Sequence, residues 1–139
     1  MTNQNIFTIG NQIAVEPGGT LVDVFLYSKG SGRDAPNQTL EGLMRSTDGG
    51  QQLTPPSPIT RTRWSMTVGP NKGVPMGTGA DVGGGIPDIA ADPGNGKLYV
   101  VFEDSRFSGT HNDIAMATSG DEGQFAPTNV AVARANAAR

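Results

Sequence analysis

The segment Ser46-Thr47-Asp48-Gly49-Gly50 decides the fold, because its pattern recurs as Ser119-Gly120-Asp121-Glu122-Gly123. Each copy follows a run with strand character, residues 40–45 and 114–118, and each precedes a proline and another short apolar run. Glycine supplies the positive φ that a tight turn between antiparallel strands needs. The serine and aspartate side chains can accept hydrogen bonds from backbone N–H groups of the turn. The repeat therefore predicts two equivalent turns between antiparallel strands.

The surroundings of the two segments also match. Residues 12–25 and residues 87–102 each contain an apolar strand, an acid-Pro-Gly turn and a second strand rich in β-branched and aromatic residues. Each unit thus reads as four antiparallel strands joined by turns. We predict one unit over residues 10–64 and a second over residues 86–134, joined by a long loop over residues 65–85 within a single segment, 1–139.

The Ser-x-Asp-x-Gly pattern resembles the Asp box of the sialidase-type (BNR) β-propellers, in which four antiparallel strands form one blade. The resemblance implies an all-β chain with about two blades of a bacterial six-bladed sialidase-like protein, an incomplete or oligomer-completed propeller. A large apolar residue after each box should tuck between sheets; the second copy offers Phe125 and the first only Leu53. The alternative is that both segments are ordinary hairpin turns. The structural box residues on this reading are Ser46, Asp48, Gly50, Ser119, Asp121, Gly123 and Phe125.

Composition agrees with an all-β chain and excludes several partners. The 139 residues include 20 glycines and 10 prolines spread between apolar runs, and only the Ala-rich tail, residues 131–139, could form a helical face. The net charge of −3, without a basic cluster larger than residues 61–63, argues against nucleic acid or an anionic membrane as a partner. There is no cysteine and one histidine, His111, so we expect no metal site and no cofactor.

Targeting signals are not apparent in the sequence. Residues 1–5 are polar and lack the basic and apolar regions of a signal peptide. No apolar run approaches the roughly 20 residues of a membrane span. The family resemblance implies a secreted or periplasmic protein, whose signal would then lie outside this chain.

The densest group of polar residues is Glu103, Asp104 and Arg106, at the end of a predicted strand. Strand ends are where propellers place binding groups, so these residues, with Trp64 as a stacking platform, are the candidate site for a carbohydrate ligand. Asp104 and Arg106 could instead pair with each other or cap the loop. Trp64 could instead pack between blades.

Catalytic residues of a sialidase are not recognisable in this chain. Sialidases use a tyrosine nucleophile with an acid partner, and the family surrounds the substrate carboxylate with three arginines. In Gly85-Ile86-Pro87 a glycine stands where the family motif has its first arginine. Two functions stay open: a segment of an exo-sialidase-like glycoside hydrolase whose catalytic residues lie outside this chain, or a non-catalytic glycan- or protein-binding module.

Two blades alone would leave two apolar faces exposed. The chain could be a fragment whose other blades are missing, which is the preferred reading. It could instead form a homo-oligomer in which three copies close a six-bladed ring, or stand alone with shielded edges.

Overall fold

The structure is a computed structural model that describes residues 6–29, 39–62, 86–104, 106–107, 113–120 and 124–133. These residues form strands and turns, with no helix among them. The prediction of an all-β chain is confirmed, whereas the predicted loop over residues 65–85 lies outside the described residues. In chain order the strands are β1 (Ile6–Val15), β2 (Leu21–Lys29), β3 (Thr39–Ser46), β4 (Ser57–Arg61), β5 (Asp88–Ala91), β6 (Leu98–Asp104), β7 (Asp113–Ser119) and β8 (Phe125–Ala133).

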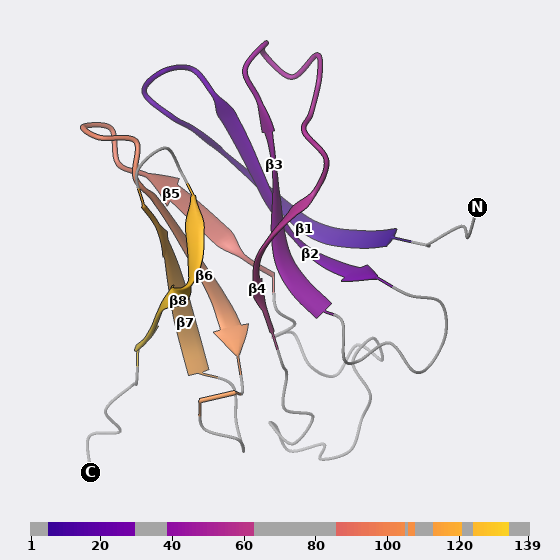
Figure 1. Cartoon of the computed structure of the whole chain (residues 1–139), viewed down its shortest axis with the longest axis vertical. Coiled ribbons are helices and arrows are strands. Elements are labelled where there is room, and N and C mark those ends of the chain that lie inside the picture. Colours follow the sequence, from indigo (N-terminus) through magenta and orange to yellow (C-terminus); the bar gives the residue numbers. More distant parts are fainter. Residues whose placement is uncertain are drawn as a thin grey trace.

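The strands form two four-stranded antiparallel sheets, each connected as a meander (Figure 1). Sheet 1 has the order β1-β2-β3-β4, and sheet 2 has the order β5-β6-β7-β8. The first connection in each sheet is an acid-Pro-Gly turn, as predicted. The Gly19 N–H donates to Glu16 O at 2.8 Å in sheet 1, and the Gly96 N–H donates to Asp92 O at 2.8 Å in sheet 2. Each of these short turns joins antiparallel neighbours without a crossover, so the first two strands of each sheet lie side by side.

β1 begins at Ile6, before the expected start of the first repeat at residue 10. The register between β1 and β2 shifts between Ile9 and Gln12. Gly10 lies in the shifted segment with a φ of 74°, a conformation that costs little without a Cβ atom. A bulge therefore joins the two halves of this strand.

The second strand of each sheet carries the same pattern. Leu21-Val22-Asp23-Val24-Phe25 begins β2, and Leu98-Tyr99-Val100-Val101-Phe102 begins β6. Successive side chains of a strand point to opposite faces of its sheet. Each sheet therefore has one face that carries Phe25 or Phe102, here called the Phe face. The other face carries the valine that precedes this phenylalanine and is called the Val face.

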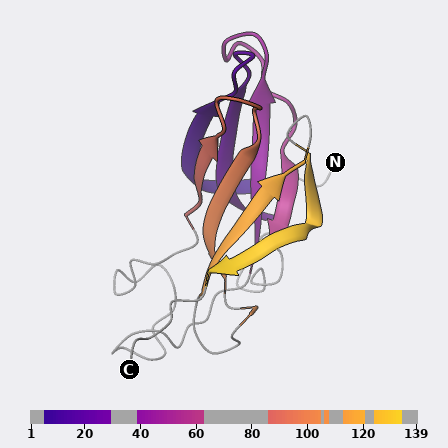
Figure 2. The same cartoon turned by 90° about the vertical axis from the view of Figure 1, so that its left-hand side faces the viewer.

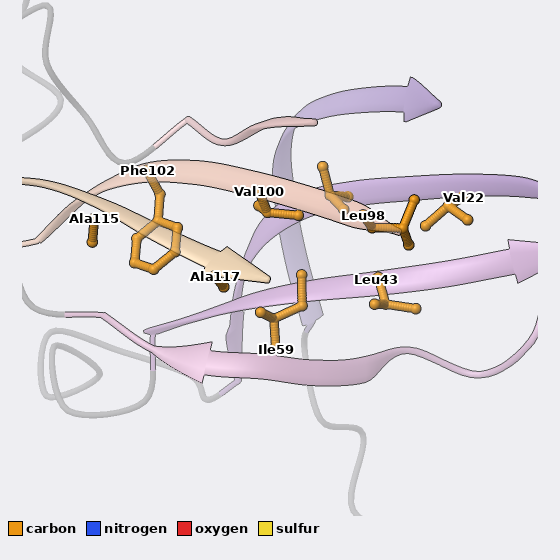
Figure 3. Close-up of a cluster of buried hydrophobic side chains, with 9 residues drawn as sticks. Val22, Leu43, Ile59, Leu98, Val100, Phe102, Ala115 and Ala117 are labelled. Carbon is orange, nitrogen blue, oxygen red and sulfur yellow. The ribbon is translucent and has the colours of Figure 1, made fainter. Parts of the chain in front are cut away.

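The two sheets pack head to tail. The Val face of sheet 1 lies against the Phe face of sheet 2, and buried side chains of the two faces point toward one another (Figure 3). Since unlike faces meet, sheet 2 follows sheet 1 as one repeat follows another, and not as a two-fold mate. The core contains Val22, Val24, Leu43 and Ile59 from sheet 1 and Leu98, Val100, Phe102, Ala115 and Ala117 from sheet 2.

Equivalent elements of the two sheets lie side by side. β1 contacts β5, and β4 contacts β8. The β1–β2 and β5–β6 turns lie at the same end, the upper end in Figure 1, and a Cβ atom on Gly96 would lie 3.5 Å from Pro17 Cδ. Figure 2 shows sheet 2 in front of sheet 1. The sheets are therefore stacked in the same orientation.

Two aromatic residues fill the Phe face of sheet 1. Phe25 and Tyr27 are 0% and 7% exposed, and their rings make an edge-to-face contact with centroids 6.2 Å apart. Gly42 lies opposite Phe25 in β3, where a Cβ atom would approach Tyr27 Cδ1 to 2.9 Å. The two rings therefore occupy the space that a side chain at position 42 would need.

Candidate functional site

Asp104 and Arg106, two of the predicted ligand-binding residues, form an ion pair at the end of β6. Arg106 Nε donates to Asp104 Oδ2 at 2.6 Å, and Arg106 Nη2 lies 2.5 Å from the same oxygen. The backbone N–H of Arg106 donates to Asp104 Oδ1 at 2.9 Å. The Asp104 side chain is fully buried, whereas that of Arg106 is 34% exposed. This geometry matches the alternative in which the two residues pair with each other.

Arg106 also links the two sheets. Its Nη2 donates to Thr60 Oγ1, in β4 of sheet 1, at 3.3 Å. Thr60 lies opposite Glu41 in the pairing of β3 with β4, and directly opposed residues of antiparallel strands share a face. Leu43, two residues after Glu41 on β3, belongs to the core between the sheets. Glu41 therefore points toward sheet 2.

Glu41 is a buried acidic residue that was not among the predicted site residues. Its side chain is 0% exposed, and neither carboxylate oxygen has a hydrogen-bond partner. Burial raises the pKa of Glu41 from 4.5 to about 8, and the negative charge of Asp104 acts in the same direction. At neutral pH the folded chain thus holds a neutral carboxyl group beside the Asp104–Arg106 ion pair.

A comparison of the two repeats contains the signal that could have identified Glu41. Glu41 precedes Ser46 by five residues, as Ile114 precedes Ser119. The second repeat thus places an apolar residue where the first has a glutamate. A glutamate in a strand ordinarily indicates a solvent-facing position. For that reason the sequence did not predict that Glu41 would be buried.

The remaining predicted ligand-binding residues do not join this group in the structure. Glu103 lies opposite Ile114 in β7, so it lies on the Val face of sheet 2, whereas Asp104 lies on the Phe face. Glu103 is half-buried. Trp64 lies outside the described residues. The structure therefore unites Asp104 and Arg106 with Thr60 and Glu41, and it separates them from Glu103.

The first box turn is closed by the side chains of Ser46 and Asp48. Ser46 Oγ donates to Asp48 Oδ1 at 2.7 Å and accepts from the Gly50 N–H at 2.8 Å. The Gln52 N–H donates to Asp48 Oδ1 at 2.9 Å. The hydrogen bond from Ser46, followed by that from Gln52, lowers the pKa of Asp48 below its usual range. Leu53 is 52% exposed and therefore does not fill the space between the sheets.

The second box serine has a different partner. Ser119 is 1% exposed, and its Oγ accepts from the Leu98 N–H, in the neighbouring strand β6, at 2.9 Å. Phe125 is partly buried against the core between the sheets. Asp121 and Gly123 lie outside the described residues. Ser119 thus connects the end of β7 to the start of β6.

The Ser119→Ala variant is expected to be less stable than the native chain by about 1–3 kcal/mol, because the buried Leu98 N–H loses its acceptor. Urea denaturation monitored by circular dichroism measures this difference. Ser57→Ala, at an exposed position on β4, is the matched control and should shift stability by less than about 0.5 kcal/mol. Equal effects of the two substitutions would contradict the role assigned to the Ser119 hydroxyl.

The buried group of Glu41, Thr60, Asp104 and Arg106 joins the two sheets. Both carboxyl groups are 0% exposed, so a substrate cannot contact them in this arrangement. Across the described residues no group of three or more His, Cys, Asp or Glu side chains is suited to hold a metal ion. The chemistry available here is the retention of a proton by Glu41 and a cross-sheet hydrogen bond from Arg106.

Comparison with known proteins assigns no family: no family model matches the chain, and no curated protein gives a significant match. In the part of the chain that the structure describes, no helix is long and apolar enough to cross a membrane.

Proposed function

We propose that this chain forms two consecutive blades of a sialidase-type β-propeller. The head-to-tail packing of the Val face of sheet 1 on the Phe face of sheet 2 carries the proposal. A propeller needs this arrangement, because every blade presents one face to the blade before it and the other face to the blade after it. The meander order of each sheet supports the same reading, as do Ser46 and Ser119, which end the third strand of their sheets.

On this proposal the two blades supply scaffold and glycan contacts to an exo-sialidase-like glycoside hydrolase. The two tyrosines of the chain lie within sheets: Tyr27 is buried on the Phe face of sheet 1, and Tyr99 is half-buried on the Val face of sheet 2. Neither position suits a nucleophile that must reach a sugar. The reacting groups would therefore come from blades other than these two.

A non-catalytic glycan- or protein-binding module is the second candidate, and the arginine pairing favours it. Arg106 is bound to Asp104, and Arg45 Nη1 lies 3.2 Å from Glu16 Oε2. An arginine already engaged with a carboxylate of its own chain cannot form the two-pronged contact with a substrate carboxylate unless that pair breaks.

Two assays on one preparation of the full chain separate these functions. A glycan microarray reports binding, and a fluorogenic sialoside reports hydrolysis. The hydrolase segment is expected to retain sialylated glycans and to release no fluorophore by itself. The non-catalytic module is expected to retain glycans irrespective of sialic acid. Retention of no glycan would contradict glycan recognition in both forms, and fluorophore release would contradict the assignment of catalysis to other blades.

A further inference from the structure

Ionisable side chains gather at one end of the core between the sheets. Glu41 of β3 and Asp104 of β6 are both 0% exposed. Asp113 of β7 is half-buried and lies opposite Asp104, so it is on the same face of sheet 2. Among the described side chains, the faces of β2 and β4 that meet sheet 2 carry no ionisable residue, and the sequence of β8 contains none. In the described part of the chain, Arg106 is therefore the cation that faces three carboxyl groups.

Arg106 cannot neutralise both buried carboxyl groups in this arrangement. Its Nε donates to Asp104 Oδ2 at 2.6 Å, and its Nη2 donates to Thr60 Oγ1 at 3.3 Å. Neither carboxyl oxygen of Glu41 has a hydrogen-bond partner. If the guanidinium group moved to Glu41, Asp104 would become a buried charge without a partner. Because an unpaired buried charge is strongly unfavourable, Glu41 can occupy this place only as a neutral carboxyl group.

This group of residues lies at one end of the contact between the sheets. Asp104 is the last residue of β6, and Glu41 is near the start of β3. The β1–β2 and β5–β6 turns lie at the other end (Figure 1). There, a Cβ atom on Gly96 would be in van der Waals contact with Pro17 Cδ, at 3.5 Å. Water can therefore reach Glu41 if the sheets part only at the end where β6 finishes.

We propose that loss of the Glu41 proton parts the two sheets at this end, while the end that holds the two turns stays closed. In the closed form Glu41 keeps its proton up to its pKa of about 8, whereas in the open form water surrounds the carboxyl group and its pKa returns to 4.5. Opening should therefore be rarest below about pH 4.5 and become about tenfold more frequent with each pH unit up to about pH 8. This opening does not depend on the function proposed above.

Single cysteines can report the opening, because the chain contains no cysteine. Ala115, 0% exposed, lies opposite Phe102 at the end near Asp104. Ala117, 2% exposed, lies opposite Val100 in the same strands and is farther from that end (Figure 3). Ala115→Cys is thus the reporter, and Ala117→Cys is its matched control. The experiment measures the rate at which a water-soluble thiol reagent labels each variant over a series of pH values, with Glu41 and with Glu41→Gln.

Labelling of Ala115→Cys is expected to be faster than that of Ala117→Cys. Low concentrations of urea should hardly change the rate for Ala115→Cys, because a local opening exposes little surface, and should raise the rate for Ala117→Cys steeply. The rate for Ala115→Cys with Glu41, divided by the rate with Glu41→Gln, should rise about tenfold per pH unit and level off near pH 8. This ratio removes the effect of pH on the thiol itself.

Two results would overturn the proposal. Equal rates for the two cysteines, with the same dependence on urea, would mean that the sheets part only when the whole chain unfolds. A ratio that does not change with pH would mean that Glu41 does not control the opening.

A second pair of reporters decides if Ala115→Cys fails to fold. Leu26, 6% exposed, lies opposite Glu41 in the pairing of β2 with β3, whereas Val22, 0% exposed, lies opposite Arg45 toward the other end. Cysteine is smaller than leucine or valine, so neither substitution overfills the core. Leu26→Cys is expected to behave as described for Ala115→Cys, and Val22→Cys as described for Ala117→Cys. Equal labelling of this pair would contradict the proposal in the same way.

Discussion

The native chain is expected to become less stable as the pH rises from about 4.5 to about 8, because Glu41 is buried. The Glu41→Gln variant is expected to show no such decrease. Burial, together with the charge of Asp104, raises the pKa of Glu41 from 4.5 to about 8. Across this range the folded chain keeps a proton that the unfolded chain releases. The stability is therefore full below about pH 4.5 and falls as the pH rises to about 8. The whole span corresponds to about 5 kcal/mol, which is large against the roughly 5–15 kcal/mol that stabilises a typical domain.

Urea denaturation of the native chain and of Glu41→Gln at a series of pH values measures this effect. Glu103→Gln is the matched control, since Glu103 is an acidic residue of the adjoining sheet that lies on the face away from Glu41. That variant should retain the pH dependence of the native chain. If Glu41→Gln also retained it, a different ionisable group would be responsible, and the neutral state assigned to Glu41 would be wrong.

The Phe102→Ala variant is expected to unfold both sheets at a lower denaturant concentration. Phe102 is 2% exposed and packs in the core that both sheets share. Truncation of a buried phenylalanine to alanine costs about 3–5 kcal/mol, because contacts are lost and a cavity remains. A loss of this size removes much of the stability of a chain this small.

Hydrogen exchange distinguishes a shared core from two independent sheets. In Phe102→Ala the amide protection of β2 and β3, in sheet 1, should fall together with that of β6 and β7, in sheet 2. Phe107→Ala is the control, because Phe107 is 36% exposed and its ring contacts Arg106 from outside the core. Unchanged protection in sheet 1 of Phe102→Ala would mean that the sheets unfold separately.

The turns and the strand order could be predicted from the sequence because both depend on short-range interactions. The first box turn is built from hydrogen bonds that Ser46 and Asp48 make with residues no farther along the chain than Gln52. The acid-Pro-Gly turns likewise close over a few residues. Turns of this kind place consecutive strands side by side as antiparallel neighbours, and their repetition along the chain indicated two units of four strands.

The composition of the candidate site could be predicted only in part. Asp104 and Arg106 are close in sequence, and their pairing is a local contact that the sequence offered as an alternative. Thr60 joins them from a strand 46 residues away. No local pattern connects these positions, because nothing in either strand indicates which sheet will lie beside it.

By itself, the sequence determined an all-β chain with two units of four strands and the turns that begin them, since strand-forming residue types and turn chemistry act between near neighbours. Only the tertiary structure decided which faces meet. In β2 the residues from Val24 to Tyr27 are buried on both faces, so alternation cannot distinguish the face that contacts sheet 2. That long-range choice brings Glu41 against Asp104 and removes it from water, and the loss of hydration, which no neighbour in the sequence causes, is what raises its pKa.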